Sequence, residues 1–102
     1  MNSFEDRKKS FEKKFAHDEE LQFKVSARKN KYIGQWVSQI LGHNAEKEKE
    51  YIQSVIKADF EEAGDQDVFR KIKGDLKDHN ISDEEIRKKM DELNEKAKSE
   101  FN

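Results

Sequence analysis

Apolar side chains recur every three or four positions along most of this chain, and proline is absent. This spacing gathers them on one side of an α-helix, whereas a half-buried strand needs alternation at every second position. The pattern therefore predicts an all-α protein. Four helices are expected, over residues 18–41, 45–63, 66–79 and 83–101. Their short connections favour antiparallel neighbours, so we expect a four-helix bundle over residues 18–102.

Residues with known preferences for helix ends stand at the boundaries of these segments. Asp18 is a suitable N-cap, and Gly42 and Gly64 are suitable C-terminal stops. Ser82 and Glu85 have the spacing of a capping box at the start of the last helix. The expected core faces, in chain order, are Val25, Tyr32, Ile33, Trp36, Val37 and Ile40; Tyr51, Ile52, Val55 and Ile56; Val68, Phe69, Ile72 and Leu76; and Ile86, Met90, Leu93, Ala97 and Phe101.

The first seventeen residues follow a different pattern. Phe4, Phe11 and Phe15 stand on a charged background and fall within about 40° of one another around a helix. This phenylalanine stripe is too narrow to close a core of its own, and three rings left in water are an unusual surface. The stripe does not continue into the next helix because the in-phase positions Asp18 and Gln22 are polar. We therefore expect a joint near residue 17 and a mobile or loosely packed helical segment over 1–17, whose partner is either the rest of this chain or another protein.

Composition excludes several classes of function. The chain has 102 residues, 43% of them charged, a net charge of -2 and no cysteine. Glycine-rich phosphate loops are absent, and the three histidines lack the spacing of a helical metal pair, so we expect no metal, no cofactor and no enzymatic activity. A sequence pI near 6.0 argues against nucleic acid. No apolar run is long enough to cross a bilayer, and we expect a cytoplasmic protein without direct membrane insertion.

Two residues within the expected bundle admit a structural and a functional interpretation. Asp59 lies in the middle of an apolar arc, where a carboxylate must be paired or hydrogen-bonded. A lysine or the first N–H groups of the next helix are the expected partners, and a ligand-contacting acid is the alternative. Trp36 is expected to anchor the core, and an interface role is its alternative.

Longer stretches of the chain resemble a known family. FEDRKKSFEKKFAHDEELQFK at 4–24, RKNKYIGQWVSQILG at 28–42, KADFEEAGDQDVFRK at 57–71 and RKKMDEL at 87–93 are similar to the zeta subunits of alphaproteobacterial F-type ATP synthases. The KFAHDEELQFK and KADFEEAGD blocks are the specific parts. The resemblance covers nearly the whole chain.

The resemblance implies a natural inhibitor of ATP hydrolysis, peripheral to the inner membrane through the synthase. It implies an N-terminal segment that inserts at a catalytic alpha/beta interface and blocks movement of the rotor, so the implied partners are the alpha, beta and gamma subunits. Residues 1–17 match this segment, and the expected contact residues are Phe4, Arg7, Lys8, Lys9, Phe11, Lys13, Lys14 and Phe15. The alternatives are a non-inhibitory helical adaptor of the synthase and a regulatory protein that binds ATP or ADP weakly.

Overall fold

Helices account for most of the described chain. The structure is a computed structural model, and it describes residues 13–61 and 66–101. These ranges contain no strand, and their main helices are α2 (Glu19–Leu41), α3 (Ala45–Glu61), α4 (Gln66–Asp75) and α5 (Asp83–Phe101). The prediction of an all-α protein is confirmed.

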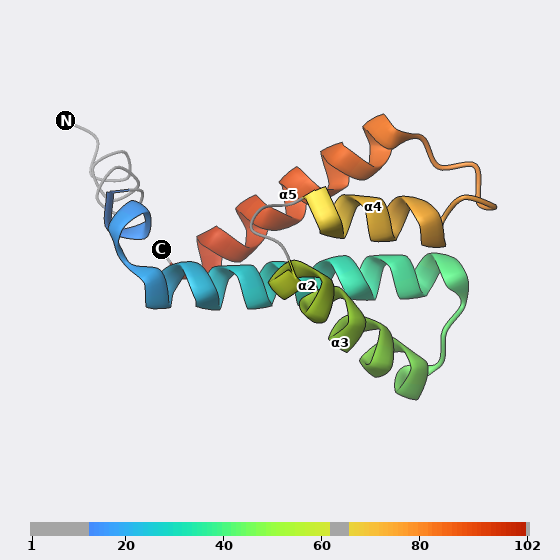
Figure 1. Ribbon diagram of the computed structural model, residues 1–102, viewed down its shortest axis with the longest axis horizontal. Coiled ribbons are helices and arrows are strands. Elements are labelled where there is room, and N and C mark those ends of the chain that lie inside the picture. The colour runs from blue at the N-terminus through green and yellow to red at the C-terminus, as the bar shows by residue number, and fades with distance from the viewer. Residues whose placement is uncertain (1–12, 62–65, 102) are drawn as a thin grey trace.

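Helix α2 is the longest element, and α3 and α5 both pack against it (Figure 1). Helix α4 in turn contacts α3 and α5, so the four helices surround one core. The fully buried side chains at its centre include Ile33 and Val37 of α2, Val55 of α3 and Ile72 of α4. Trp36, which the sequence predicts as a core anchor, is only partly buried and packs against this cluster rather than within it.

The helix ends are closed by the residues that the sequence singles out. Gly42 adopts the left-handed conformation, with φ 72° and ψ 31°, and ends α2. The backbone N–H of His43 then donates to the carbonyl oxygen of Ser38 at 3.0 Å, as in a Schellman motif. At the start of α5 the Ser82 hydroxyl accepts from the N–H of Glu85 at 3.1 Å, which confirms the serine half of the capping box. Gly64 lies outside the described residues.

The predicted end of the third expected helix is wrong by four residues. Helix α4 ends at Asp75 rather than at residue 79, and turns follow over residues 76–80. Gly74 lowers the helix propensity just before this end, and Asn80 closes the turns with a left-handed φ of 54°. Leu76 is still buried, as predicted, because its N–H donates to the carbonyl of Ile72 and keeps the side chain on the apolar face.

Gly34 allows α2 and α3 to approach closely. A Cβ atom at this position would lie 2.7 Å from Cγ1 and 3.0 Å from Cα of Ile52. The second distance involves backbone, which cannot move aside as a side chain can. The absence of a side chain at Gly34 therefore sets the spacing between these two helices.

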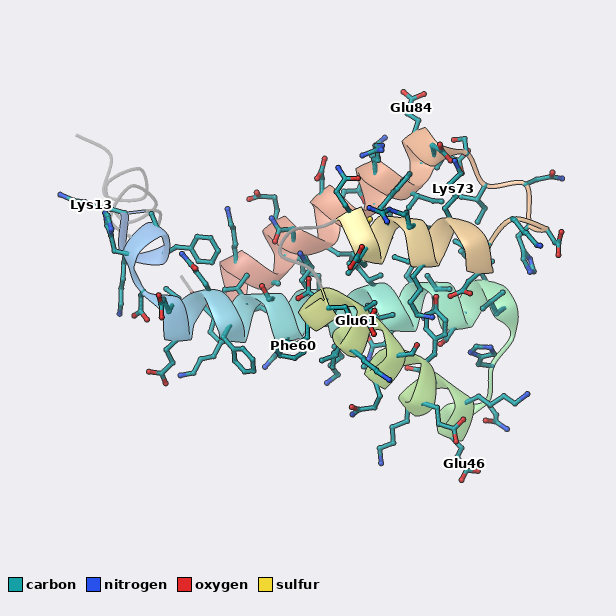
Figure 2. All side chains as sticks on the ribbon, in the orientation of Figure 1. Lys13, Glu46, Phe60, Glu61, Lys73 and Glu84 are labelled. Atoms are coloured by element: carbon teal, nitrogen blue, oxygen red, sulfur yellow. The ribbon has the colours of Figure 1, made fainter. Side chains whose placement is uncertain are left out.

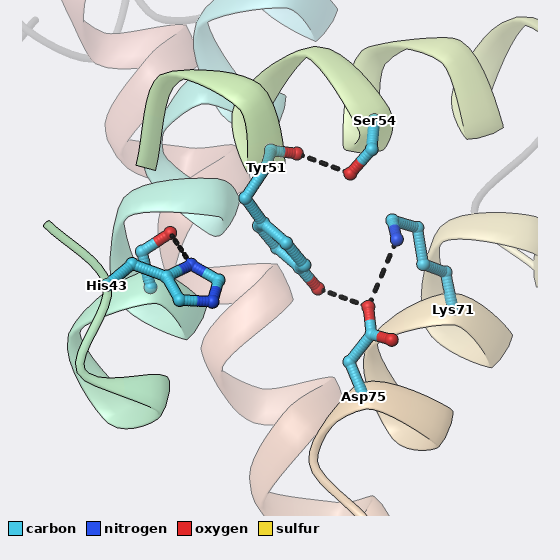
Figure 3. A network of polar contacts seen from close by, with 6 residues as sticks. His43, Tyr51, Ser54, Lys71 and Asp75 are labelled. Atoms are coloured by element: carbon cyan, nitrogen blue, oxygen red, sulfur yellow. Dashed lines mark hydrogen bonds and ion pairs between the residues drawn. The ribbon is translucent and has the colours of Figure 1, made fainter. Parts of the chain in front are cut away.

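A polar network joins α3 to α4 at the edge of the core (Figure 3). The Tyr51 hydroxyl donates to Asp75 Oδ2 at 2.7 Å, and Lys71 Nζ donates to the same oxygen at 3.1 Å. The His43 ring lies 5.7 Å from the Tyr51 ring, and its Nδ1 is 3.3 Å from the Ser38 hydroxyl. Burial, and then the adjacent Asp75 carboxylate, raises the pKa of the Tyr51 phenol well above its ordinary range.

Replacing Gly34 with alanine should destabilise the fold because the new methyl group would push α3 away from α2. We expect G34A to lower the free energy of unfolding by about 1–3 kcal/mol in urea denaturation. Gly74→Ala is the matched control, since nothing lies within 4 Å of a Cβ atom there. It should leave stability unchanged or raise it by about 0.5 kcal/mol. Equal effects of the two substitutions would contradict the close approach of the helices.

The raised pKa of Tyr51 predicts a loss of stability at high pH. The folded phenol keeps its proton above about pH 10, where the unfolded phenol releases it, so Tyr51 makes stability fall as pH rises through this range. Tyr51→Phe should remove this contribution. We expect the free energy of unfolding of the wild type to fall more steeply than that of Y51F above about pH 10, by at most about 1 kcal/mol per pH unit. Parallel curves would show that the phenol is not held protonated by the fold.

Candidate functional site

Three of the eight predicted contact residues lie in the described part of the chain. Lys13, Lys14 and Phe15 belong to a helical stretch that ends at His17, just before α2. Both lysines are exposed, and Lys13 points away from the helical body (Figure 2). Phe15 is half-buried. The other five residues, Phe4, Arg7, Lys8, Lys9 and Phe11, lie outside the described residues.

Asp18 forms the joint between the two helical stretches. Its backbone is extended, with φ -108° and ψ 100°, so the helix axis is interrupted at this one residue. Its N–H donates to the Lys14 carbonyl at 2.9 Å, and its Oδ1 accepts from the N–H of Leu21 at 3.1 Å. Asp18 thus closes one helix and caps the next. This confirms the break in register that the sequence predicts near residue 17.

Gln22 holds the joint from the side of α2. Its Nε2 donates to the backbone carbonyl of Phe15 at 2.8 Å, and it lies 3.3 Å from the carbonyl oxygen of Ala16. Carbonyl groups at the end of a helix lack partners within the helix, so a side-chain donor stabilises that end. Gln22 therefore fixes how the stretch 13–17 leaves the body.

Phe15 also contacts the far end of the chain. The Nζ atom of Lys98, on α5, lies 4.9 Å from the centre of the Phe15 ring. An ammonium group over a ring face is worth about 0.5–1 kcal/mol at an exposed site. This contact joins the end of the first helical stretch to α5.

The sequence pattern missed a second feature, a groove between the first turns of α2 and the last turn of α3. Phe23 and Phe60 are the large apolar residues that the described chain exposes most, at 56% and 66%. Their ring centres are 5.9 Å apart, and both line a cavity of about 260 Å³ together with Asn30 and Asp59. Phe23 and Phe60 escaped notice because each lies at the edge of its helix's apolar arc.

Asp59 has a different partner from the two that the sequence predicts. Asn30 Nδ2 donates to Asp59 Oδ2 at 3.0 Å, so an amide of α2 takes the place of a lysine or of the next helix's N–H groups. Asn30 is 1% exposed. The signal that could have identified it is its position in phase with Ile33 and Val37, which places a polar side chain on the buried face of α2.

Two kinds of site are absent from the described residues. Among them, no group of three or more histidine, aspartate or glutamate side chains is arranged to hold a metal ion. None of the described helices is long and apolar enough to cross a membrane. What this part of the chain presents is a basic, partly apolar segment at the joint and an acidic aromatic groove beside it.

Comparison with protein-family models identifies one family. Residues 1–100 match the model of the family described as ATPase inhibitor subunit zeta. One similar solved structure, titled a solution NMR structure of the protein, is 44% identical in sequence with a TM-score of 0.71. The alignment covers 79% of this chain and 94% of that chain. No curated protein sequence matches this chain.

Removing the Gln22 side chain should loosen the joint without unfolding the body. Gln22→Ala deletes the donor to Phe15 and Ala16, at a local cost of about 1 kcal/mol. We expect amide protons of residues 15–18 to exchange about fivefold faster, measured by NMR, with no change in the core of α2. Gln39→Ala is the control, because Gln39 is exposed on the same helix. Unchanged exchange in Q22A would show that the glutamine does not hold the joint.

Proposed function

Because this chain belongs to the ATPase inhibitor subunit zeta family, we propose that it inhibits ATP hydrolysis by the F-type ATP synthase through residues 1–17. In this proposal the segment inserts as a helix at a catalytic alpha/beta interface and reaches the gamma subunit, which blocks rotation in the hydrolytic direction. Residues 18–102 form a four-helix body that stays outside the interface. The single observation that supports this division most directly is the interruption of the helix at Asp18.

The contacts at the joint are consistent with a segment that changes partner. Lys13 and Lys14 are exposed, and Phe15 makes a cation–π contact with Lys98. Among the described residues, the buried core is built from α2–α5 and the turn after α4, and none of these three side chains belongs to it. Insertion therefore costs the body little of its stability.

The free energy of insertion requires contributions from both residues 1–17 and the helical body. Burying three phenylalanine side chains contributes on the order of 5–9 kcal/mol, whereas ordering each residue costs about 1–2 kcal/mol. Over seventeen residues the ordering cost is larger than this gain. Lysine and arginine contacts and the docked body must contribute the remainder, and coupled folding of this kind is easily regulated.

A non-inhibitory adaptor is the second candidate, favoured by the contacts that tie residues 15 and 16 to the body. If Gln22 and Lys98 held the whole segment permanently, the chain would bind the synthase through its outer surface alone. The adaptor and the inhibitor share the same proposed location, at the cytoplasmic side of the inner membrane through the synthase. They differ in their effect on ATP hydrolysis.

An ATP hydrolysis assay on the cognate catalytic head tests the proposed function. The full chain should inhibit, and a chain that starts at Asp18 should not, provided that its circular dichroism shows the helical body intact. Phe11→Ala should weaken inhibition by at least about tenfold, since a buried ring contributes more than about 1.4 kcal/mol. Phe11→Leu is the matched control and should retain most of the effect.

The outcomes separate the two candidates. Equal inhibition by the full and the shortened chain would show that residues 1–17 are not the inhibitory element. An intact chain that binds the head without slowing hydrolysis would establish the adaptor.

A further inference from the structure

The groove between α2 and α3 is lined by hydrogen-bond acceptors and aromatic rings, and none of the described residues that line it is basic. Its walls include Phe23 of α2 and Phe60 of α3, its depth includes Asn30 and Asp59, and Glu19 stands at its rim. Figure 2 shows Phe60 at the end of α3, beside α2. The groove shares Gln22 with the joint, but none of residues 13–17 is among its lining residues.

Asn30 leaves an acceptor unused in the wall of this groove. Its Nδ2 must point to Asp59, because a carboxylate accepts hydrogen bonds and an amide oxygen has no proton to give. Its Oδ1 is then buried without a hydrogen-bond partner, and no other side-chain nitrogen or oxygen in the described chain is in this condition. A buried polar atom without a partner costs about 1–3 kcal/mol. A donor that reaches it from the groove would recover that free energy.

Asp59 is held by a neutral group rather than by a cation. The side chain is half-buried, its hydrogen bond comes from the Asn30 amide, and no ion pair of the described residues includes it. A carboxylate in a partly desolvated site is stabilised most by an opposite charge. The groove therefore favours a cationic ligand.

The two exposed phenylalanine rings also favour a cationic ligand. The rings of Phe23 and Phe60 are tilted by 37° and expose more than half of their surface. Ring faces attract cations, and the flat guanidinium group of arginine also stacks on them. Ala27 and Ile56 supply apolar lining that suits the methylene groups of such a side chain.

We propose that this groove is a docking site for an arginine side chain presented by a partner protein. The methylene stem lies between Phe23 and Phe60, and the guanidinium group donates to Asp59 and to Oδ1 of Asn30. Arginine fits better than lysine because its planar fork presents donors in two directions at once. Because the site lies on the helical body, this proposal does not depend on whether residues 1–17 inhibit ATP hydrolysis.

The test is an NMR titration of the full chain with N-acetyl-arginine amide as the probe. Saturable shifts of the Phe23, Asn30 and Phe60 signals are expected, with a Kd on the order of 10 mM for a single side chain. The citrulline derivative has the same shape without the charge and should bind at least about fivefold more weakly. Equal binding of the norleucine derivative, or no saturable shift with the arginine probe, would overturn the proposal.

Variants assign the binding to the groove. Asp59→Asn keeps the shape of the side chain and should weaken binding of the probe by at least about fivefold, whereas Glu61→Gln, an exposed acid on the same helix, should not. Phe60→Ala should weaken binding without loss of stability, because its ring is largely exposed. An equal effect of D59N and E61Q would show that the probe is attracted by charge in general rather than bound by Asp59, and would contradict the proposal.

Two further measurements test the nature of the occupant. Arg7→Ala should leave the probe's Kd unchanged. A tighter Kd in R7A would show that this chain's own N-terminal segment fills the groove, and signals of Phe23 and Phe60 that move on dilution would identify a second copy as the occupant. Either result would contradict the proposal that a separate partner protein occupies the groove.

Discussion

The burial of one face of α2 is the interaction on which the remaining structure depends. Ile33 and Val37 are fully buried in that face, and Gly34 between them lets α3 approach to backbone contact. Helix α5 packs on α2 as well, where Arg28 forms a 2.9 Å ion pair with Glu100. Helix α2 is thus held by two neighbouring helices.

One extended residue separates α2 from the helical stretch that precedes it. A helix continued through Asp18 would carry the phenylalanine stripe onward along the axis of α2. The extended backbone at Asp18 instead takes Phe15 out of the register of α2, while the Gln22 side chain keeps the end of the first helix in place. Gln22 also lines the aromatic groove, so the joint and the proposed arginine site share a side chain.

Periodicity was sufficient to predict the helical class, the break before α2 and most of the core. Six of the predicted core residues are only partly buried, namely Tyr32, Trp36, Ile40, Ile52, Ile56 and Phe101. Periodicity was insufficient wherever the outcome depends on how two helices are placed in space. The pairing of Asn30 with Asp59 requires the crossing of α2 and α3, which no local pattern contains. The early end of α4 lies next to Gly74, where the free energies of helix and turn are nearly equal. Helix propensity alone therefore does not predict where α4 ends. The contact residues in 1–12 stay predictions.

In the proposed function, residues 1–17 dock on the synthase rather than on the body of their own chain. Hydrogen exchange followed by mass spectrometry, on the free chain and on its complex with the cognate catalytic head, measures this directly. The account predicts rapid exchange across residues 4–15 in the free chain and strong protection in the complex, with the core of α2 protected in both. Strong protection of residues 4–15 in the free chain would contradict it, because the segment would then already be packed on its own body.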